Sequence, residues 1–191
     1  KEELSPRERI GGIASEKFWK VMHKVPMLSL SNTYNIGEIE DFDQRCRKIV
    51  GLDKKLEYIL ELKLDGLSIS LIYENGKFIK AVTRGDGQIG EDVTENVMQI
   101  KSIPKKLKEN ISIEVRGEIV LPISQFNKVN NERMEEGEDV FANPRNAAAG
   151  TIRQLDSSIV KERGLDCYLY YLVEAEKHGV KSHEESIKFI E

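Results

Sequence analysis

The segment with the clearest chemical potential is Glu61-Leu62-Lys63-Leu64-Asp65-Gly66, in which a lysine lies two residues from an acid on either side. Side chains that alternate along a β-strand share a face, so a strand here would place the lysine and both acids on one face and the two leucines on the other. The lysine is then either part of a solvated strand surface or a nucleophile at a nucleotide site.

As a nucleophile, Lys63 would attack a phosphorus atom and form a phosphoramide bond. An amine attacks in its neutral form, whereas flanking carboxylates favour the protonated form. A divalent metal held near the acids and a phosphate would reverse that balance. Taken alone, the motif favours the solvated surface, and the choice depends on the rest of the chain.

Two more charged groups are predicted to lie at strand ends beside glycines, where ligand sites often form on a sheet. Arg84 precedes Gly85 and could contact a phosphate or a ribose. Glu118 follows Gly117 and could accept hydrogen bonds from a ribose diol. Each is equally consistent with a solvated charge, but together with Lys63 they outline a candidate nucleotide site.

A GxGxxG pattern spans residues 85–90, between a predicted strand and a predicted helix. The strand is the second arm of a predicted hairpin and does not open a parallel βαβ unit. Glu91 and Asp92 would also repel a pyrophosphate at the start of the helix. We therefore do not interpret this pattern as a dinucleotide-binding site.

Two cations, Arg145 and Arg153, lie eight residues apart on a predicted helix that is rich in small residues. The residues Asn143 and Pro144 form a typical helix start, with Asn as the N-cap. The helix is either a close-packed surface element or a contact for the phosphate backbone of a nucleic acid.

The pattern of apolar residues predicts an α+β fold with a largely antiparallel sheet. Helices are expected over residues 37–50, 91–100, 124–136 and 145–154 and from residue 184 onward. Strands are expected over residues 58–63, 67–73, 78–83, 111–121 and 167–173. The pair Asn75-Gly76 predicts a two-residue hairpin turn. Phe126, Val129 and Met134 are predicted to face inward from their helix.

Composition narrows the class of protein. The chain has 191 residues, 32% of them charged, and a formal net charge of −4, so bulk charge does not mark it as a nucleic-acid binder. Two distant cysteines fit no metal spacing and indicate a reducing compartment, here the cytoplasm.

The sequence contains no apolar run of the roughly 20 residues that a membrane helix needs. Because the chain lacks an initiating Met and ends within a predicted helix, we interpret it as a fragment.

Five blocks of sequence carry a further signal: His23–Leu30, Glu61–Gly66, Thr83–Gly87 with Gly90–Asp92, Val115–Glu118, and Phe141–Gly150 with Arg153–Asp156. In this order they resemble the adenylation domain of bacterial NAD-dependent DNA ligases. The resemblance implies a nucleotidyltransferase (ATP-grasp-like) fold with largely antiparallel sheets and flanking helices. It also implies that residues 23–191 form an adenylation domain truncated at its C-terminal end, and that residues 1–22 are a linker or the end of a preceding region.

The resemblance implies a role for each site residue. Lys63 would be the catalytic nucleophile, supported by Asp65. The cofactor-binding residues would be those around the adenosine: Ser29, Leu30, Glu61, Arg84, Glu118 and Tyr170. The DNA-binding residues would be Arg145 and Arg153, near the nick. The resemblance assigns no metal ligand to this chain.

The implied reaction transfers AMP from NAD to Lys63 and releases nicotinamide mononucleotide. The AMP then passes to the 5′ phosphate of a nick, and the 3′ hydroxyl displaces it, in DNA replication and repair. NAD and Mg²⁺ are the implied cofactors. Nicked double-stranded DNA and the remaining domains of the same ligase chain are the implied partners of a monomer that does not bind a membrane. Without those domains, we expect the fragment to seal no nicks.

Two alternatives belong to other classes. An ATP-dependent nucleotidyltransferase would share the short lysine motif, and labelling of Lys63 by ATP or by NAD separates it from the leading interpretation. A noncatalytic nucleic-acid-binding module would keep its function after Lys63→Ala.

Overall fold

The computed structural model describes residues 18–51 and 56–191. Contacts divide these residues into two compact units. The main unit contains residues 18–27 and 64–191, and the insertion contains residues 28–51 and 56–63. The predicted boundary at residue 22 stays a prediction, and most of the predicted linker lies outside the described residues.

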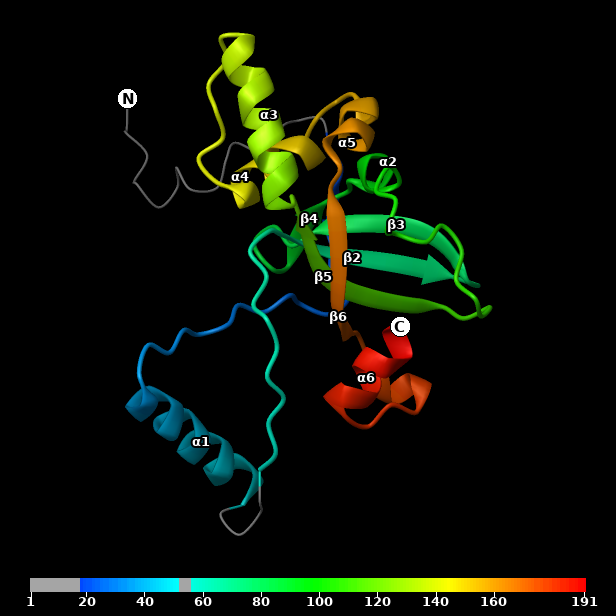
Figure 1. The fold of residues 1–191 in the computed structure, drawn as a ribbon. Helices are drawn as coiled ribbons and strands as arrows, with labels where there is room; N and C mark the ends of the chain where they lie inside the picture. Colours follow the sequence, from blue (N-terminus) through cyan, green and yellow to red (C-terminus); the bar gives the residue numbers. More distant parts are fainter. Residues whose placement is uncertain (1–17, 52–55) are drawn as a thin grey trace, which may run out of the picture. The chain divides into compact units, whose positions relative to one another are not determined.

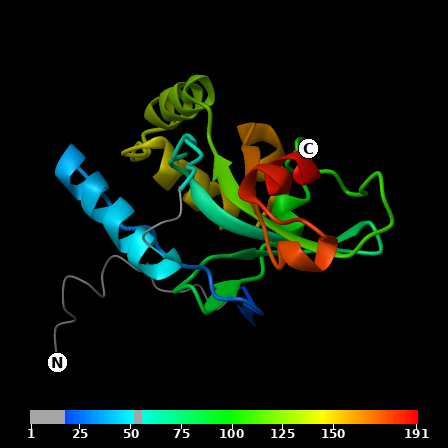
Figure 2. The same cartoon turned by 90° about the horizontal axis from the view of Figure 1, so that it is seen from below.

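A four-stranded antiparallel sheet forms the centre of the main unit, with the strand order β3-β2-β5-β6 (Figure 1). Its strands are β2 (Leu67–Glu74), β3 (Lys77–Thr83), β5 (Ile113–Val120) and β6 (Asp166–Leu172). Two short strands, β1 (Lys20–Met22) and β4 (Ile89–Glu91), pair with each other. Figure 2 shows the twist of the larger sheet in a second view. The predicted α+β class with a largely antiparallel sheet is therefore confirmed.

The hairpin between β2 and β3 forms as predicted. Asn75 and Gly76 both have positive φ angles, of 48° and 73°, which is the conformation that a type I′ turn requires. Glu74 then pairs with Lys77, and Tyr73 with Phe78.

The core lies on one face of the sheet. Apolar residues that alternate along β2 and β5, such as Ile69, Leu71 and Ile119, are fully buried there. The helices that pack against this face are α2 (Thr94–Val97), α4 (Pro144–Ile152) and α5 (Ser157–Arg163). Ala147 and Ala148 of α4 are fully buried, so small side chains let this helix approach the sheet closely. The opposite face carries polar residues.

The remaining elements of the main unit are α3 (Ile123–Glu135), the 3₁₀ turn η1 (Ala175–His178) and α6 (His183–Ile190), which packs against β6. Val129 of α3 is buried and Phe126 packs on the core, as predicted. Met134 is 59% exposed, so its predicted inward orientation is wrong. It lies in the last turn of α3, where the helix reaches solvent.

Two predicted elements differ from the structure. The strand predicted over residues 58–63 is wrong, because these residues carry no regular secondary structure and pair with no strand among the described residues. Leu60 and Leu62 are 97% and 88% exposed, so the alternating leucines do not anchor a strand face. The helix predicted over residues 91–100 is reduced to the four residues of α2, because Glu91 pairs with Lys20 in the smaller sheet.

The insertion contains one helix, α1 (Ile36–Val50). Asn35 caps its start by accepting a hydrogen bond from the Glu38 N–H, and Gly51 ends it at a φ of 105°. None of its residues is buried. Every helix in residues 18–51 and 56–191 is too short or too polar to cross a membrane.

Candidate functional site

A buried carboxylate, Glu118, collects three neutral hydrogen-bond donors on the polar face of the sheet. It is 6% exposed and lies on β5 directly opposite Ser68 of β2. The Gly66 N–H donates to its Oε1 at 3.3 Å, and the Ser68 hydroxyl donates to its Oε2 at 3.0 Å. The Tyr170 hydroxyl donates to the same Oε2 at 3.3 Å. A carboxylate offers about four lone-pair sites, so Glu118 retains capacity for one more donor.

Tyr170 reaches Glu118 because β6 contains a β-bulge. Arg116 pairs with Tyr171 and Gly117 pairs with Leu169, which leaves Tyr170 as the extra residue. A bulge re-aims the side chain of the residue it adds, here toward the neighbouring strand. Burial, reinforced by the negative charge and the hydrogen bond of Glu118, raises the pKa of Tyr170 to about 12. The phenol therefore stays a donor across the physiological pH range.

Gly66 approaches the backbone of β5 too closely for any other residue. A Cβ atom at this position would lie 2.1 Å from the carbonyl oxygen of Ile119. This closeness lets the Gly66 N–H reach the carboxylate of Glu118. The glycine of the lysine motif is thus explained by packing.

Arg84 joins the same region from the end of β3. Its N–H donates to the carbonyl of Ser68 at 3.2 Å, and its positive charge lowers the pKa of Tyr170 slightly against the dominant effect of burial. His23, which is buried, lies with its Nε2 at 3.0 Å from the carbonyl oxygen of Thr83 and 3.2 Å from that of Arg84. Because carbonyl oxygens only accept, we assign the imidazole proton to Nε2.

Hydrogen bonds hold the segment 23–27 against this polar face. The His23 N–H donates to Gln88 and the Met27 N–H to Gly87, both at 2.8 Å. From β5, the guanidinium of Arg116 donates to the carbonyls of Val25 and Pro26. Gly87 has a φ of 98°, and a Cβ there would lie 2.6 Å from the Met27 carbonyl oxygen. The glycines of residues 85–90 therefore serve a tight loop that leads into β4, with no parallel strand beside it in the described residues.

The four other predicted nucleotide-site residues, Ser29, Leu30, Glu61 and Lys63, belong to the insertion. All four are exposed within the described residues. Their positions around a bound nucleotide stay predictions. Asp65, the predicted support of Lys63, belongs to the main unit and forms an ion pair at 3.2 Å with Arg145. Both partners are largely exposed, so this pair adds little to stability.

The second predicted DNA contact, Arg153, is held differently. Its Nε lies 3.2 Å from Oε2 of Glu91, and the Nζ of Lys20 lies 3.1 Å from Oε1 of the same residue. The Glu91 side chain is 7% exposed, whereas those of Lys20 and Arg153 are 52% and 45% exposed. A buried carboxylate therefore holds two cations at the surface.

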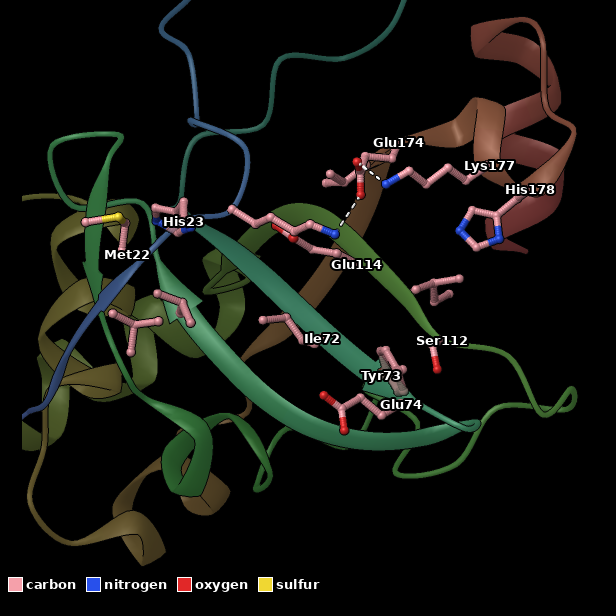
Figure 3. A pocket seen from close by; sticks show the side chains of 15 residues that line it. Met22, His23, Ile72, Tyr73, Glu74, Ser112, Glu114, Glu174, Lys177 and His178 are labelled. Carbon is pink, nitrogen blue, oxygen red and sulfur yellow. Dashed lines mark hydrogen bonds and ion pairs between the residues drawn. The ribbon is translucent and has the colours of Figure 1, made fainter.

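A separate cavity of about 400 Å³ lies further along the polar face (Figure 3). Its lining includes His23, Ile72, Glu114 and Glu174, and both Lys24 and Lys177 form ion pairs with Glu174. None of the predicted site residues lines it. The cavity therefore does not support the assignment of the nucleotide site.

Mg²⁺ is the implied metal, and a site for it would need oxygen ligands that lie close together. In the described part of the chain, no group of three or more His, Cys, Asp or Glu side chains is placed to hold a metal ion. Mg²⁺ often binds through one or two carboxylates plus substrate phosphates and water. The described residues therefore do not form a magnesium site by themselves.

Sequence reasoning missed several residues that structure brings into these sites. Ser68 was detectable, since it follows Gly66 at the strand period and the strand itself was predicted. Lys20 and Glu91 were not, because the pairing of β1 with β4 joins residues 71 positions apart. Arg116 was recognised only as part of a motif, while its contacts to Val25 and Pro26 depend on how the segment 23–27 crosses the sheet.

Residues 15–191 match the family described as the NAD-dependent DNA ligase adenylation domain. The chain is 62% identical over 192 residues to a DNA ligase of Fusobacterium nucleatum, covering 100% of this chain and 28% of that protein. It is 55% identical over 186 residues to a DNA ligase of Thermosipho africanus, covering 97% of this chain and 28% of that protein. The chain thus spans a little over a quarter of the length of these curated relatives.

Proposed function

This chain belongs to the family of NAD-dependent DNA ligase adenylation domains, and on that premise we propose that it accepts AMP from NAD within a longer DNA ligase. The Nζ of Lys63 attacks the α-phosphorus of NAD and forms a phosphoramide bond. The bond between that phosphorus and the bridging oxygen breaks, and nicotinamide mononucleotide leaves with its own phosphate. The lysine ammonium releases one proton to solvent before the attack and a second as the P–N bond forms, and the phosphoramide nitrogen keeps one N–H.

The later steps belong to the whole ligase. AMP passes from Lys63 to the 5′ phosphate of a nick, and the 3′ hydroxyl displaces it to close the strand. Such a ligase would act in DNA replication and repair. Mg²⁺, when bound with the phosphates, would neutralise part of their charge.

The main support for this proposal is the set of hydrogen-bond donors around Glu118. A buried carboxylate that accepts only neutral hydrogen bonds in the described structure can exchange one of them for a ribose hydroxyl at low cost. The aromatic ring of Tyr170 would stack on adenine while its hydroxyl stays on Glu118. Arg84 would then contact the ribose or its neighbourhood, and Ser29, Leu30 and Glu61 would line the adenine.

Covalent connection adds support for the role of Lys63. Gly66, whose N–H donates to Glu118, follows Lys63 by three positions in the chain. An extended chain spans at most about 3.6 Å per residue, so the Cα atoms of Lys63 and Gly66 lie within roughly 11 Å. We therefore propose that Lys63 acts on a phosphate bound next to this ribose.

The finer features of the domain follow the same premise. We propose a nucleotidyltransferase (ATP-grasp-like) fold formed by residues 23–191 together with further parts of a longer chain, and a preceding region that ends near residue 22. The four-stranded antiparallel sheet with helices on its core face supports this fold. We also propose a monomer in the cytoplasm that binds nicked double-stranded DNA.

The test labels the enzyme with its adenylate donor. A full-length ligase containing this chain is incubated with NAD or with ATP carrying a label in the adenylate group, and the modified peptide is mapped. We expect NAD to label Lys63, Lys63→Arg to abolish the label, and substitution of the exposed control Lys101→Arg to leave it unchanged. Labelling by ATP would favour an ATP-dependent nucleotidyltransferase. Normal ligation by Lys63→Ala would favour a noncatalytic nucleic-acid-binding module.

A further inference from the structure

Two half-exposed cations share one buried carboxylate at the edge of the smaller sheet. Lys20 of β1 and Glu91 of β4 are cross-strand partners, so their side chains lie on the same face. Lys20 binds Oε1 of Glu91 and Arg153 binds Oε2, so each cation has its own oxygen. The three groups together carry a net charge of +1, with the negative charge buried and the positive charges at the surface.

Hydrogen bonds fix the backbone next to the side chains of this cluster. The buried side-chain amide of Asn96 donates to the carbonyls of Ile152 and Gln154, at 2.6 and 2.7 Å, and these carbonyls flank Arg153 in the chain. The N–H of Glu91 donates to the hydroxyl of Thr83 at 3.0 Å. The backbone at both ends of the Arg153–Glu91 ion pair is thus fixed, which limits the entropy lost when a ligand binds.

The cations keep unused donors for an anion. Among the described residues, only Nε of Arg153 is engaged, and a guanidinium carries four further N–H donors on its terminal nitrogens. The ammonium of Lys20 has three donors, and Glu91 occupies one. Arginine and lysine with free donors at a surface are the groups that contact nucleic-acid phosphates.

We propose that Lys20 is a second contact to the DNA phosphate backbone, beside Arg153, and that Glu91 positions both cations. This inference rests on the proposed function, in which Arg153 contacts DNA near the nick. The alternative is an ion pair that only ties β1 to β4. A purely structural pair would change the melting temperature on mutation but not the salt dependence of DNA binding.

The test measures binding of a nicked duplex by the full-length ligase over a range of salt concentrations. Replacement of one phosphate contact reduces the slope of log K against log salt by about 0.9. We expect Lys20→Gln to reduce the slope by about this amount and to weaken binding roughly three- to tenfold at low salt. Lys20→Arg, which keeps the charge, should retain the slope.

A matched control lies four residues away. Lys24 is 71% exposed and pairs with Glu174, and we expect Lys24→Gln to leave the slope unchanged. An unchanged slope for Lys20→Gln, with a reduced slope for Arg153→Gln, would overturn the role of Lys20 alone. Unchanged slopes for both would also overturn the proposed contact of Arg153 with DNA. Melting temperatures of all variants identify any loss of folding.

Discussion

Glu118 and Glu91 are two buried carboxylates with different surroundings. Glu118 is 6% exposed and accepts hydrogen bonds from an amide and two hydroxyls, whereas Glu91 is 5% exposed and binds two cations. Neutral donors leave a carboxylate able to exchange partners with a ribose hydroxyl. Cations bound to a buried carboxylate are instead held in place, with their remaining donors directed elsewhere. The type of partner therefore separates a candidate nucleotide site from a candidate DNA contact.

The largest expected effect is on stability, from a substitution of Gly66, whose N–H is the amide donor to Glu118. Gly66→Ala would place a Cβ atom 2.1 Å from the Ile119 carbonyl oxygen, so the backbone must move away from β5. We expect the free energy of unfolding to fall by about 1–3 kcal/mol, as for other overpacked sites. Denaturant unfolding of the 191-residue chain measures this change.

The control for that substitution lies in the first turn of α1. Gly37→Ala would place a Cβ atom 3.3 Å from Oδ1 of Asn35, the capping oxygen of α1, which needs to shift by only a few tenths of an ångström, and Ala favours a helix. We expect it to be neutral or slightly stabilising. Equal losses for both variants would contradict the close approach of Gly66 to β5.

A smaller effect concerns the ionisation of Tyr170. Its pKa of about 12 has burial as the main cause and the charge of Glu118 as the next. We expect Glu118→Gln to lower the pKa of Tyr170 toward the ordinary 10.0 without reaching it. Ultraviolet titration of the protein against Tyr170→Phe isolates this phenol, and an unchanged pKa would contradict the contact.

The same pKa predicts how stability depends on pH. The pKa of Tyr170 is higher in the folded chain than in the unfolded chain, so folding favours the neutral phenol. Its contribution to stability is complete below pH 10 and is lost as the pH rises toward about 12. In Tyr170→Phe, the free energy of unfolding should depend less on pH across this window, as measured by unfolding at a series of pH values.

The smallest effect is expected at Ser68, which supplies one of the three donors to Glu118. Ser68→Ala removes one hydrogen bond to a charged group and leaves two, so we expect a loss of about 1 kcal/mol or slightly more in binding. The KM for NAD should rise roughly five- to tenfold with little change in kcat. An equal fall in kcat would indicate that Ser68 acts on the transition state.

The sequence predicted local structure better than tertiary structure. Asn75-Gly76 and the Asn143 cap act through their immediate neighbours, and each formed the expected turn or helix start. The strand predicted over residues 58–63 was wrong, because alternating leucines do not make a strand without a partner. Pairing partners lie far apart in the chain and are invisible to periodicity.

The residues of the candidate sites also fall into those found from local motifs and those that depend on strand pairing. The motif around Glu118 was recognisable because a glycine and an acid follow each other in a predicted strand, but the predicted strand-end position is wrong, since Glu118 lies within β5 and pairs with Ser68 and Tyr168. The bulge that turns Tyr170 toward Glu118 and the pairing that joins Lys20 to Glu91 depend on register between strands. Lys63 was found from its motif, and its role stays a prediction that only chemistry can test.

The difference in role between Glu118 and Glu91 can be measured directly in the full-length ligase. Glu118→Gln and Glu91→Gln are compared in two assays: the transfer of AMP from NAD to Lys63, and the sealing of a nick whose 5′ phosphate already carries AMP. We predict that Glu118→Gln slows the first step roughly tenfold or more and that Glu91→Gln chiefly weakens the second through lost affinity for DNA. If both variants impaired both steps equally, the assignment of separate nucleotide and DNA roles would be wrong.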